Sequence, residues 1–315
     1  MPAPKITIRS LQALLAVYEE QSFSRAADRE NATQSGMSTQ VKKLETILGR
    51  PLLKRGKGAL ELTPAGEIVY ERGRHVLKSL FELEEKIDSL DRSVSGAIRL
   101  GVIPTLTRAV LPRAMGQFRT AYPDVEVSVI EEYSFSLMRR VAMGELDWAA
   151  VPAGDLLSGL KATYLASDSE VLAASPDALP GHRHLDPVRP ADLNGLNLIL
   201  PSSINVRRRG LEQYFTSHGV EPGEVMDMDA MLGTLELIAS GGWCAILPAA
   251  ICHTDLPGER RKLHPLIEPS IRTDYVIVQK AEVALSRAAE LMFEHLKSAA
   301  LEIREDWDAA VEGRG

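Results

Sequence analysis

The sequence predicts an α/β protein in which an all-helical N-terminal part precedes a larger α/β domain. Up to about residue 92, apolar residues recur mostly at helical spacing, whereas from residue 96 short apolar strands alternate with helical segments. A chain of 315 residues favours two or three domains, at about 100–200 residues each. We therefore expect a head over residues 1–63, a linker helix over 64–93, an α/β domain over 94–303 and a loosely ordered tail over 304–315.

Three short helices are predicted in the first fifty residues. The first carries its apolar side chains on one face, at Leu11, Leu14, Leu15 and Tyr18. The second covers residues 22–29, with Ser22 as its N-cap and with Phe23, Ala26 and Ala27 facing inward. The third covers residues 33–49, has an apolar stripe and stops at Gly49; the stripe is Met37, Val41, Leu44 and Leu48.

The second and third helices are spaced as in a helix-turn-helix. The small pair Ala26-Ala27 allows close helix approach, and only about four residues, near Glu30–Thr33, separate the two helices. A three-helix bundle without a role at DNA has the same spacing, so this pattern alone leaves both interpretations open.

A β-wing and a long helix are predicted to follow. Leu60–Leu62 alternates in polarity and would pair near Leu52-Leu53, with glycines 56 and 58 shaping a tip that carries Lys54, Arg55 and Lys57. Thr63-Pro64 is a helix start, with Thr as N-cap and Pro at the first helical position.

The long helix, expected from Pro64 to about Arg92, has an apolar stripe formed by Ile68, Val76, Leu80, Leu83, Ile87 and Leu90. From Val76 the steps are 4, 3, 4 and 3 residues, the heptad spacing of helices that pair with another chain. Packing of the helix against its own domain is the alternative.

From residue 97 onward, strands and helices alternate, which predicts a mainly parallel sheet. The expected strands are 97–103, 125–130, 146–151, 170–174, 197–200 and 275–278, and the expected helices are 107–122, 136–143, 207–218, 230–239 and 286–302.

Charge is distributed unevenly along the chain. The net charge of −7 by itself disfavours a nucleic-acid partner. Residues 1–60, however, hold ten Lys/Arg against five Asp/Glu, whereas residues 96–315 hold 21 against 30. This asymmetry favours one basic module for a polyanion and an acidic module for another task.

Several classes of protein are disfavoured. No stretch is long and apolar enough to span a bilayer, and MPAPKITIRS lacks the apolar core of a signal peptide, so we expect a cytoplasmic protein without a membrane partner. Cys244 and Cys252 read as reduced, partly buried thiols, and no metal site or other cofactor is expected. GxSxG, GxGxxG, P-loop and HExxH motifs are absent, which argues against an enzyme.

Residues 11–66 closely resemble the LysR-type family of transcription regulators. The resemblance rests on the serine–phenylalanine turn at 22–23 and on Ala26-Ala27, Thr33-Gln34-Ser35, Leu44-Glu45, Gly49, Leu52-Leu53, Arg55 and Leu62-Thr63-Pro64-Ala65-Gly66. Two positions depart from the family pattern: Ser35 stands where proline is common, and Thr39 stands where a basic residue is usual. These departures bear on sequence preference rather than on the fold.

The resemblance implies a winged helix-turn-helix whose third helix enters the major groove of double-stranded DNA. Gln34 would read adenine through its amide, while Ser35, Ser38 and Thr39 offer hydroxyls or contact a thymine methyl. Lys42, Lys43, Arg55, Lys57 and the backbone N–H of Ser22 would contact phosphates or the adjacent minor groove.

A weaker resemblance covers the C-terminal domain, at residues 101–105, 144–147, 201–203 and 241–248. It implies a two-lobed, periplasmic-binding-protein-like fold with an effector cleft, lobe I over about 94–168 and 270–303 and lobe II over about 169–269. The residues expected at a small-molecule effector are Thr105, Leu106, Thr107, Ser134, Ser202, Ser203, Asn205 and Met231. For each Ser or Thr, plain capping or turn chemistry is the alternative.

The charge of the effector stays open. Arg207-Arg208-Arg209 reads as a solvated helix start, or else one arginine lines the cleft and pairs a carboxylate effector. Asp227 and Asp229 favour a ligand with a donor group instead. The resemblance further implies a homodimer through the linker helix, a homotetramer, and an operator that is an interrupted palindrome. A free-standing solute-binding protein and a regulator that ignores small molecules are the rival functions.

Overall fold

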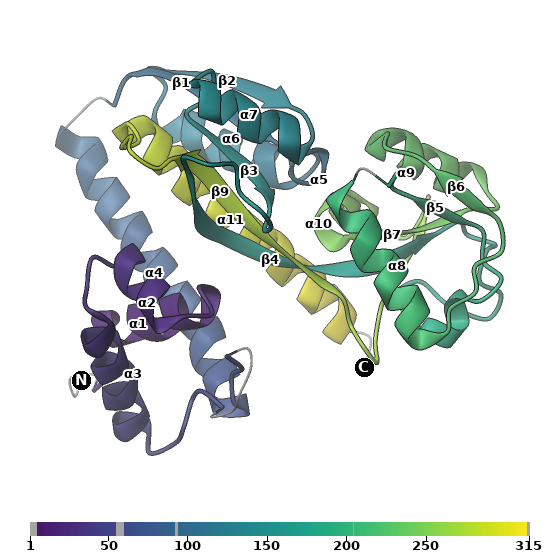
Figure 1. Cartoon of the computed structure of the whole chain (residues 1–315), viewed down its shortest axis with the longest axis horizontal. Coiled ribbons are helices and arrows are strands. Elements are labelled where there is room, and N and C mark those ends of the chain that lie inside the picture. Colours follow the sequence, from purple (N-terminus) through teal and green to yellow (C-terminus); the bar gives the residue numbers. More distant parts are fainter. Residues whose placement is uncertain (1–4, 55–59, 92–93, 204, 314–315) are drawn as a thin grey trace. The chain divides into compact units, whose positions relative to one another are not determined.

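The computed structural model describes residues 5–54, 60–91, 94–203 and 205–313. The chain divides into two compact units, Met1–Ser93 and Val94–Gly315, which we call unit 1 and unit 2 (Figure 1). Each unit has its own buried core and is described separately.

Unit 1 begins with three helices: α1 (Ile8–Glu19), α2 (Phe23–Arg29) and α3 (Gln34–Leu48). Each starts at a hydroxyl N-cap, because Thr7, Ser22 and Thr33 accept the backbone N–H three residues ahead. Gly49 ends α3 in the left-handed region, at φ 67°. The predicted cap at Ser22, the stop at Gly49 and the apolar faces are confirmed, and the buried faces of the three helices share one core.

The predicted wing is reduced, in the part of the chain that is described, to one antiparallel bridge between Leu53 and Leu62. The expected tip, with Arg55, Lys57 and glycines 56 and 58, lies outside the described residues. The strand partners named from the sequence are therefore correct at the base of the wing.

Helix α4 (Pro64–Asp91) starts as predicted, with Thr63 Oγ1 accepting the N–H of Gly66 at 3.0 Å. A Cβ on Gly66 would lie 2.1 Å from the carbonyl oxygen of Leu52, so glycine is required where α4 passes this backbone segment. One face of α4 packs on α1, since Gly73 lies against Leu11 and Leu15.

A second face of α4 leaves apolar side chains exposed. Ile68, Val76 and Leu83 are 67%, 48% and 55% exposed. The intramolecular packing expected as an alternative thus accounts for one face of α4 and leaves these three side chains unexplained. Nothing is described of the side chains of Ile87 and Leu90.

Unit 2 is an α/β domain. Its strands are β1 (Gly96–Val102), β2 (Val125–Glu131), β3 (Trp148–Pro152), β4 (Leu160–Ala174), β5 (Leu198–Leu200), β6 (Val225–Asp227), β7 (Cys244–Pro248), β8 (Lys262–Pro265) and β9 (Arg272–Lys280). Its helices are α5 (Pro104–Thr107), α6 (Val110–Ala121), α7 (Ser134–Met143), α8 (Val206–His218), α9 (Met231–Ser240), α10 (Ala249–Cys252) and α11 (Arg287–Glu312), with 3-10 turns at Pro190–Leu193 and His253–Asp255.

The strands follow the order β2-β1-β3-β9-β4-β7-β5-β6, with β8 also paired to β4. β4 passes through both halves: it pairs with β9 up to Ser169, and with β7 and β8 from Glu170 onward. We call the half with β1, β2 and β3 lobe I and the half with β5, β6 and β7 lobe II (Figure 1).

The expectation of a mainly parallel sheet is wrong. Strands β1, β2 and β3 pair in parallel, as do β5, β6 and β7. The pairings of β3 with β9, and of β4 with β7, β8 and β9, are antiparallel, so the sheet is mixed. Strands β4 and β9 cause the difference, because every antiparallel pairing involves one of them, and strand–helix alternation does not reveal a strand such as β4 that passes from one lobe to the other.

The loosely ordered tail expected from residue 304 is also wrong, at least to Glu312, because α11 continues to that residue. Trp307 is 5% exposed and packs in a lobe II core that includes Val171, Ala173 and Leu235. The same helix packs on α6, β1 and β4. One helix is thus anchored in both lobes.

Candidate nucleic-acid interface and ligand cleft

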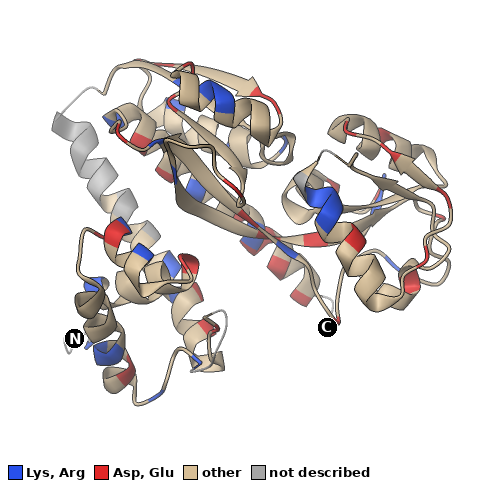
Figure 2. Ribbon diagram, in the orientation of Figure 1, with Lys and Arg blue, Asp and Glu red and all other residues tan. Residues whose placement is uncertain are grey.

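Helix α3 presents a polar face. Gln34, Ser35, Thr39, Lys42 and Lys43 are exposed and Ser38 is half-buried, whereas the predicted apolar stripe faces the core. Positions 35, 39, 42 and 46 fall opposite that stripe at 100° per residue and position 38 at its flank, so the separation follows directly from helical periodicity. Figure 2 marks the basic residues of this helix along the ribbon.

Hydrogen bonds within unit 1 set the polarity of this face. Gln34 Oε1 accepts the hydroxyl of Ser24 at 3.2 Å, so the amide can offer its Nε2 donors outward. Thr39 donates its hydroxyl to the carbonyl of Ser35 at 2.8 Å. Thr39 can therefore present a methyl group and oxygen lone pairs, but not its O–H, to a base edge.

The base of the wing is held by Gln21, a residue that the sequence did not indicate. Its Oε1 accepts the N–H of Leu60 at 2.8 Å, and its Nε2 donates to the carbonyl of Leu60 at 3.0 Å. The side chain therefore replaces one strand partner of Leu60. Lys54 pairs with Glu61 at 2.8 Å, but both side chains are more than half exposed, so the pair adds little stability.

Ser22 is half-buried, and its hydroxyl is occupied as the cap of α2, at 3.3 Å from the N–H of Arg25. Only its backbone N–H is a candidate for a phosphate. Arg29 is held by Glu19 at 2.7 Å and by Glu20 at 3.3 Å, so it stabilises unit 1 rather than belonging to the polar face of α3.

Unit 2 contains a cleft with a volume of about 520 Å³ between lobes I and II. Lobe I contributes Pro104, Thr107, Glu131, Glu132, Tyr133 and Ser136, and lobe II contributes Asp229, Ala230, Met231, Leu232, Gly233 and Ile251. A volume in this range suits a small organic ligand.

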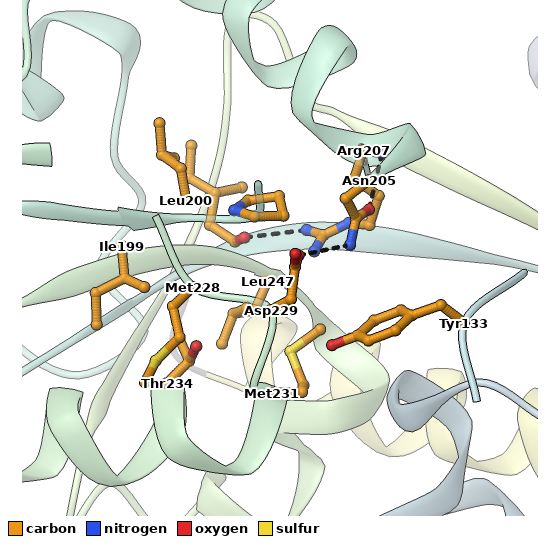
Figure 3. A pocket seen from close by; sticks show the side chains of 12 residues that line it. Tyr133, Ile199, Leu200, Asn205, Arg207, Met228, Asp229, Met231, Thr234 and Leu247 are labelled. Atoms are coloured by element: carbon orange, nitrogen blue, oxygen red, sulfur yellow. Dashed lines mark hydrogen bonds between the residues drawn. The ribbon is translucent and has the colours of Figure 1, made fainter. Parts of the chain in front are cut away.

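A much smaller hollow of about 20 Å³ adjoins the cleft and shares Tyr133, Asp229 and Met231 with it. Figure 3 shows Tyr133 extending from one side toward Asp229 and Met231 on the other. Its volume suits a single water molecule, which makes it an extension of the cleft and not a second binding site.

The floor of this hollow is organised around Asp229. Its Oδ1 accepts the N–H of Ser202 at 3.1 Å and the Nδ2 of Asn205 at 3.3 Å. Asn205 also caps α8, since its Oδ1 accepts the N–H of Arg207 at 3.1 Å. The polar groups of this loop therefore fix the carboxylate in place.

Profiles of two families match the chain over most of its length. "Bacterial regulatory helix-turn-helix protein, lysR family" matches residues 8–67, and "LysR substrate binding domain" matches residues 91–301. The chain belongs to the LysR family of transcriptional regulators.

Relatives and solved structures agree with this. The chain is 28% identical over 290 residues to the uncharacterized HTH-type transcriptional regulator YbhD of Escherichia coli, covering 92% of this chain and 90% of the relative. It is 26% identical over 293 residues to the regulator CbbR of Rhodospirillum rubrum, covering 93% and 96%. The structure of full-length CbnR with its target DNA is similar, with a TM-score of 0.54, 20% identity, and coverage of 93% and 99%.

This LysR-family chain is thus a DNA-binding transcription regulator with an effector-binding domain, and not an enzyme. Among the described residues, no group of three His, Cys, Asp or Glu is arranged to hold a metal ion. None of the described helices is long and apolar enough to cross a bilayer. Cys244 and Cys252 are free and more deeply buried than expected, and burial raises the pKa of the Cys244 thiol to about 12.

Three of the residues expected at the effector line a cavity of this LysR-type domain. Thr107 and Met231 line the cleft, and Asn205 and Met231 line the small hollow. Ser202 touches the same region through its N–H, while its buried hydroxyl lacks a hydrogen-bond partner in the described structure. Thr105 and Leu106 are buried in the core, Ser203 is exposed and Ser134 begins α7; none of these four belongs to either cavity lining.

Two of the three arginines at the start of α8 are already paired. Arg207 donates to Glu170 at 2.5 and 3.2 Å and to the carbonyl of Ile246 at 3.0 Å; the side chains of Arg207 and Glu170 are 10% and 2% exposed. Arg208 pairs with Glu212 at 2.7 Å and with Asp227 at 2.5 Å. Arg209 is exposed.

Sequence reasoning missed the three cleft residues Glu131, Glu132 and Tyr133. They stand at the carboxyl end of β2, where the parallel strands of lobe I end, and that position favours a ligand site. Burial, together with Asp229 and Glu131, raises the pKa of the Tyr133 hydroxyl, so Tyr133 enters the cleft as a neutral phenol at pH 7.

Proposed function

We propose that this LysR-family regulator works as a dimer built through α4, and that it places two copies of α3 in successive major grooves of an interrupted palindrome. The observation that carries this is the polar, exposed face of α3, with Gln34 and Ser35 at its N-terminal end and Lys42 and Lys43 farther along. Residues near the start of such a helix contact base edges, and the lysines are spaced to neutralise phosphates.

Support for the dimer comes from the exposed side chains of Ile68, Val76 and Leu83 on α4. Exposed apolar residues seven apart, such as Val76 and Leu83, form the seam of a coiled coil when a second helix covers them. Pairing of dimers into a tetramer, through parts of unit 2, is the further step that we propose for DNA bending.

The dimer is tested by sedimentation of the full chain carrying Val76→Glu and Leu83→Glu. We expect loss of the dimer and weaker binding to a palindromic duplex, because a carboxylate in a helical seam is desolvated without a partner. Glu67→Gln, at an exposed position on another face of α4, is the control. Unchanged sedimentation of the doubly substituted chain would remove α4 as the interface.

We further propose that an effector in the cleft shifts the balance between two arrangements of the lobes and thereby changes the bend of the bound DNA. A ligand shifts such a balance only if it binds the two states with different affinities. Since the cleft has walls from both lobes, a ligand that touches both is sensitive to their separation. We place this activity in the cytoplasm, where the DNA lies.

Equal DNA bend angles with and without a bound effector, measured by gel phasing, would contradict this control by ligand. The same result would favour a regulator that binds DNA and ignores small molecules. DNA binding through α3 would stand in either case.

A further inference from the structure

The cleft is acidic. Three carboxylates line it, from Glu131, Glu132 and Asp229, and no Lys or Arg is among its lining residues. The three come from both walls, since Glu131 and Glu132 lie at the end of β2 in lobe I and Asp229 precedes α9 in lobe II. An effector in this volume therefore meets carboxylates on two sides.

One of the three charges is neutralised within the protein. Glu132 accepts from Arg140 at 2.9 Å and from the hydroxyl of Ser136. Glu131 accepts only the neutral hydroxyl of Thr107, and Asp229 only the neutral donors of Ser202 and Asn205, among the interactions of the described residues. Two negative charges in the cleft thus lack a cationic partner in the described structure.

Helix N-termini oppose these charges in part. The cleft includes the first turns of α7 and α9, and each such end is equivalent to about half a positive charge. The two helix ends together offset about one of the two negative charges of Glu131 and Asp229, so the cleft keeps a net charge of about −1. This balance disfavours a carboxylate ligand and leaves room for one positive charge.

The arginine that would favour a carboxylate is not free. The guanidinium of Arg207 borders the small hollow, but it is bound to Glu170 and to the carbonyl of Ile246. Freeing it would leave Glu170, at 2% exposure, buried without a counter-ion. Arg207 therefore contributes little attraction for an anion.

Most of the remaining lining is apolar. Pro104, Met231, Leu232 and Ile251 line the cleft, and Tyr133 adds an aromatic ring on which a cation can rest. Met and aromatic side chains adapt to an organic group of variable shape. The ligand that fits both the charges and the walls has a cationic end and an apolar body.

We propose that the cleft binds an organic monocation, such as a protonated primary amine attached to an apolar group, with the ammonium held between Glu131 and Asp229. The inference rests on the proposed effector control and names its ligand class. The ammonium has three N–H donors, which suit the oxygens that these two carboxylates still have available. Binding would draw the two lobes together through one shared charge.

The test compares three probes of nearly equal size: 2-phenylethylamine, 2-phenylethanol and phenylacetate. Binding to the full chain is measured by calorimetry and by thermal shift at low salt, because a ligand that binds only the folded state raises the melting temperature. We expect the amine to bind at least about tenfold more tightly than the alcohol, the usual gain from a charge-assisted hydrogen bond. Phenylacetate should bind least.

Glu131→Gln and Asp229→Asn test the assigned residues. Each amide keeps the oxygen that accepts the internal hydrogen bonds, so the fold is retained, and each should cost the amine about tenfold in affinity without changing the affinity of the alcohol. Glu126→Gln is the matched control, since Glu126 is exposed on the same strand and outside the cleft.

The proposal of a cationic ligand would be wrong if phenylacetate bound most tightly, or if the amine and the alcohol bound equally. It would also be wrong if none of the three probes bound, or if both substitutions left the binding of the amine unchanged. DNA affinity and sedimentation, measured on the same samples, report on the regulator itself, so failure of the ligand class is distinguishable from failure of the proposed function.

Discussion

The two functional surfaces of this LysR-family regulator are built in opposite ways. The polar face of α3 comes from one helix of fifteen residues, and its orientation is set by the neighbouring core of unit 1. The cleft of unit 2 is assembled from segments as far apart as Pro104 and Ile251. A surface made from one element depends on local periodicity, whereas a cleft made from many depends on the interactions that hold distant segments in register.

The largest expected effect lies at Arg207, which holds the start of α8 to β4 beneath the cleft. Arg207→Ala leaves the buried carboxylate of Glu170 without its cation and should destabilise unit 2 by about 3–5 kcal/mol. Urea unfolding followed by tryptophan fluorescence measures this, because all three tryptophans, Trp148, Trp243 and Trp307, belong to unit 2.

Arg209→Ala is the control, since Arg209 is exposed in the same helical turn. A loss of less than about 1 kcal/mol in Arg207→Ala, a value typical of surface pairs, would mean that the cleft does not depend on this ion pair. The cleft would then differ less from the polar face of α3 in its dependence on interactions between distant segments.

The second prediction concerns Asp168, where β4 leaves lobe I. Burial raises its pKa from 3.8 to about 7, although the N–H groups of Ala250 and Ser169 favour the ionised form. Because the pKa of Asp168 is raised in the folded state, its protonated carboxyl contributes fully to the stability of unit 2 below the unfolded-state pKa. This contribution is lost as pH rises through about 7.

We therefore expect a fall in the stability of unit 2 between about pH 4 and pH 7, with a slope approaching about 1.4 kcal/mol per pH unit where the proton is held only by the folded state. Asp168→Asn should abolish that slope, even if it lowers stability at every pH by the loss of one acceptor. Asp177→Asn, at an exposed position elsewhere in lobe II, should keep it. An unchanged slope in Asp168→Asn would assign the pH dependence to other groups.

The third prediction concerns the polar face of α3 and its preference for the operator sequence. Gln34→Ala should reduce the preference for the operator over a scrambled duplex by about 1–3 kcal/mol, the value of one bidentate base contact. Fluorescence anisotropy with both duplexes measures the ratio of affinities. Gln40→Ala, on a half-buried face of α3, should change that ratio little, and an unchanged ratio in Gln34→Ala would mean that another segment reads the bases.

The smallest effect is expected from Lys42→Ala. It should weaken binding to every duplex and lower the slope of log affinity against log salt by about 0.9, the value for one phosphate contact. Lys161→Ala removes the same charge from an exposed site in unit 2 and should leave the slope unchanged. A sequence-dependent loss in Lys42→Ala would move this lysine from the phosphates to the bases.

These surfaces also differ in how far the sequence predicts them. The caps Ser22 and Thr63 and the stop at Gly49 were found correctly, because each depends on a few neighbouring residues. The expected cleft residues Thr107, Asn205 and Met231 line cavities, yet Glu131 and Tyr133 were missed, since their role depends on which distant segments face them. The pairing of Arg207 with Glu170 spans 37 residues and leaves no local pattern.

The C-terminal part of α11 has a consequence for motion in unit 2. The match to the LysR substrate binding domain ends at residue 301, but α11 runs on to Glu312, with Trp307 in the core of lobe II. Asp306 accepts from Arg113 of lobe I at 3.0 Å and lies 2.9 Å from His253 of lobe II. Helix α11 is therefore held to both lobes near its C-terminal end, so a change in their separation requires α11 to bend or the indole of Trp307 to leave the core of lobe II.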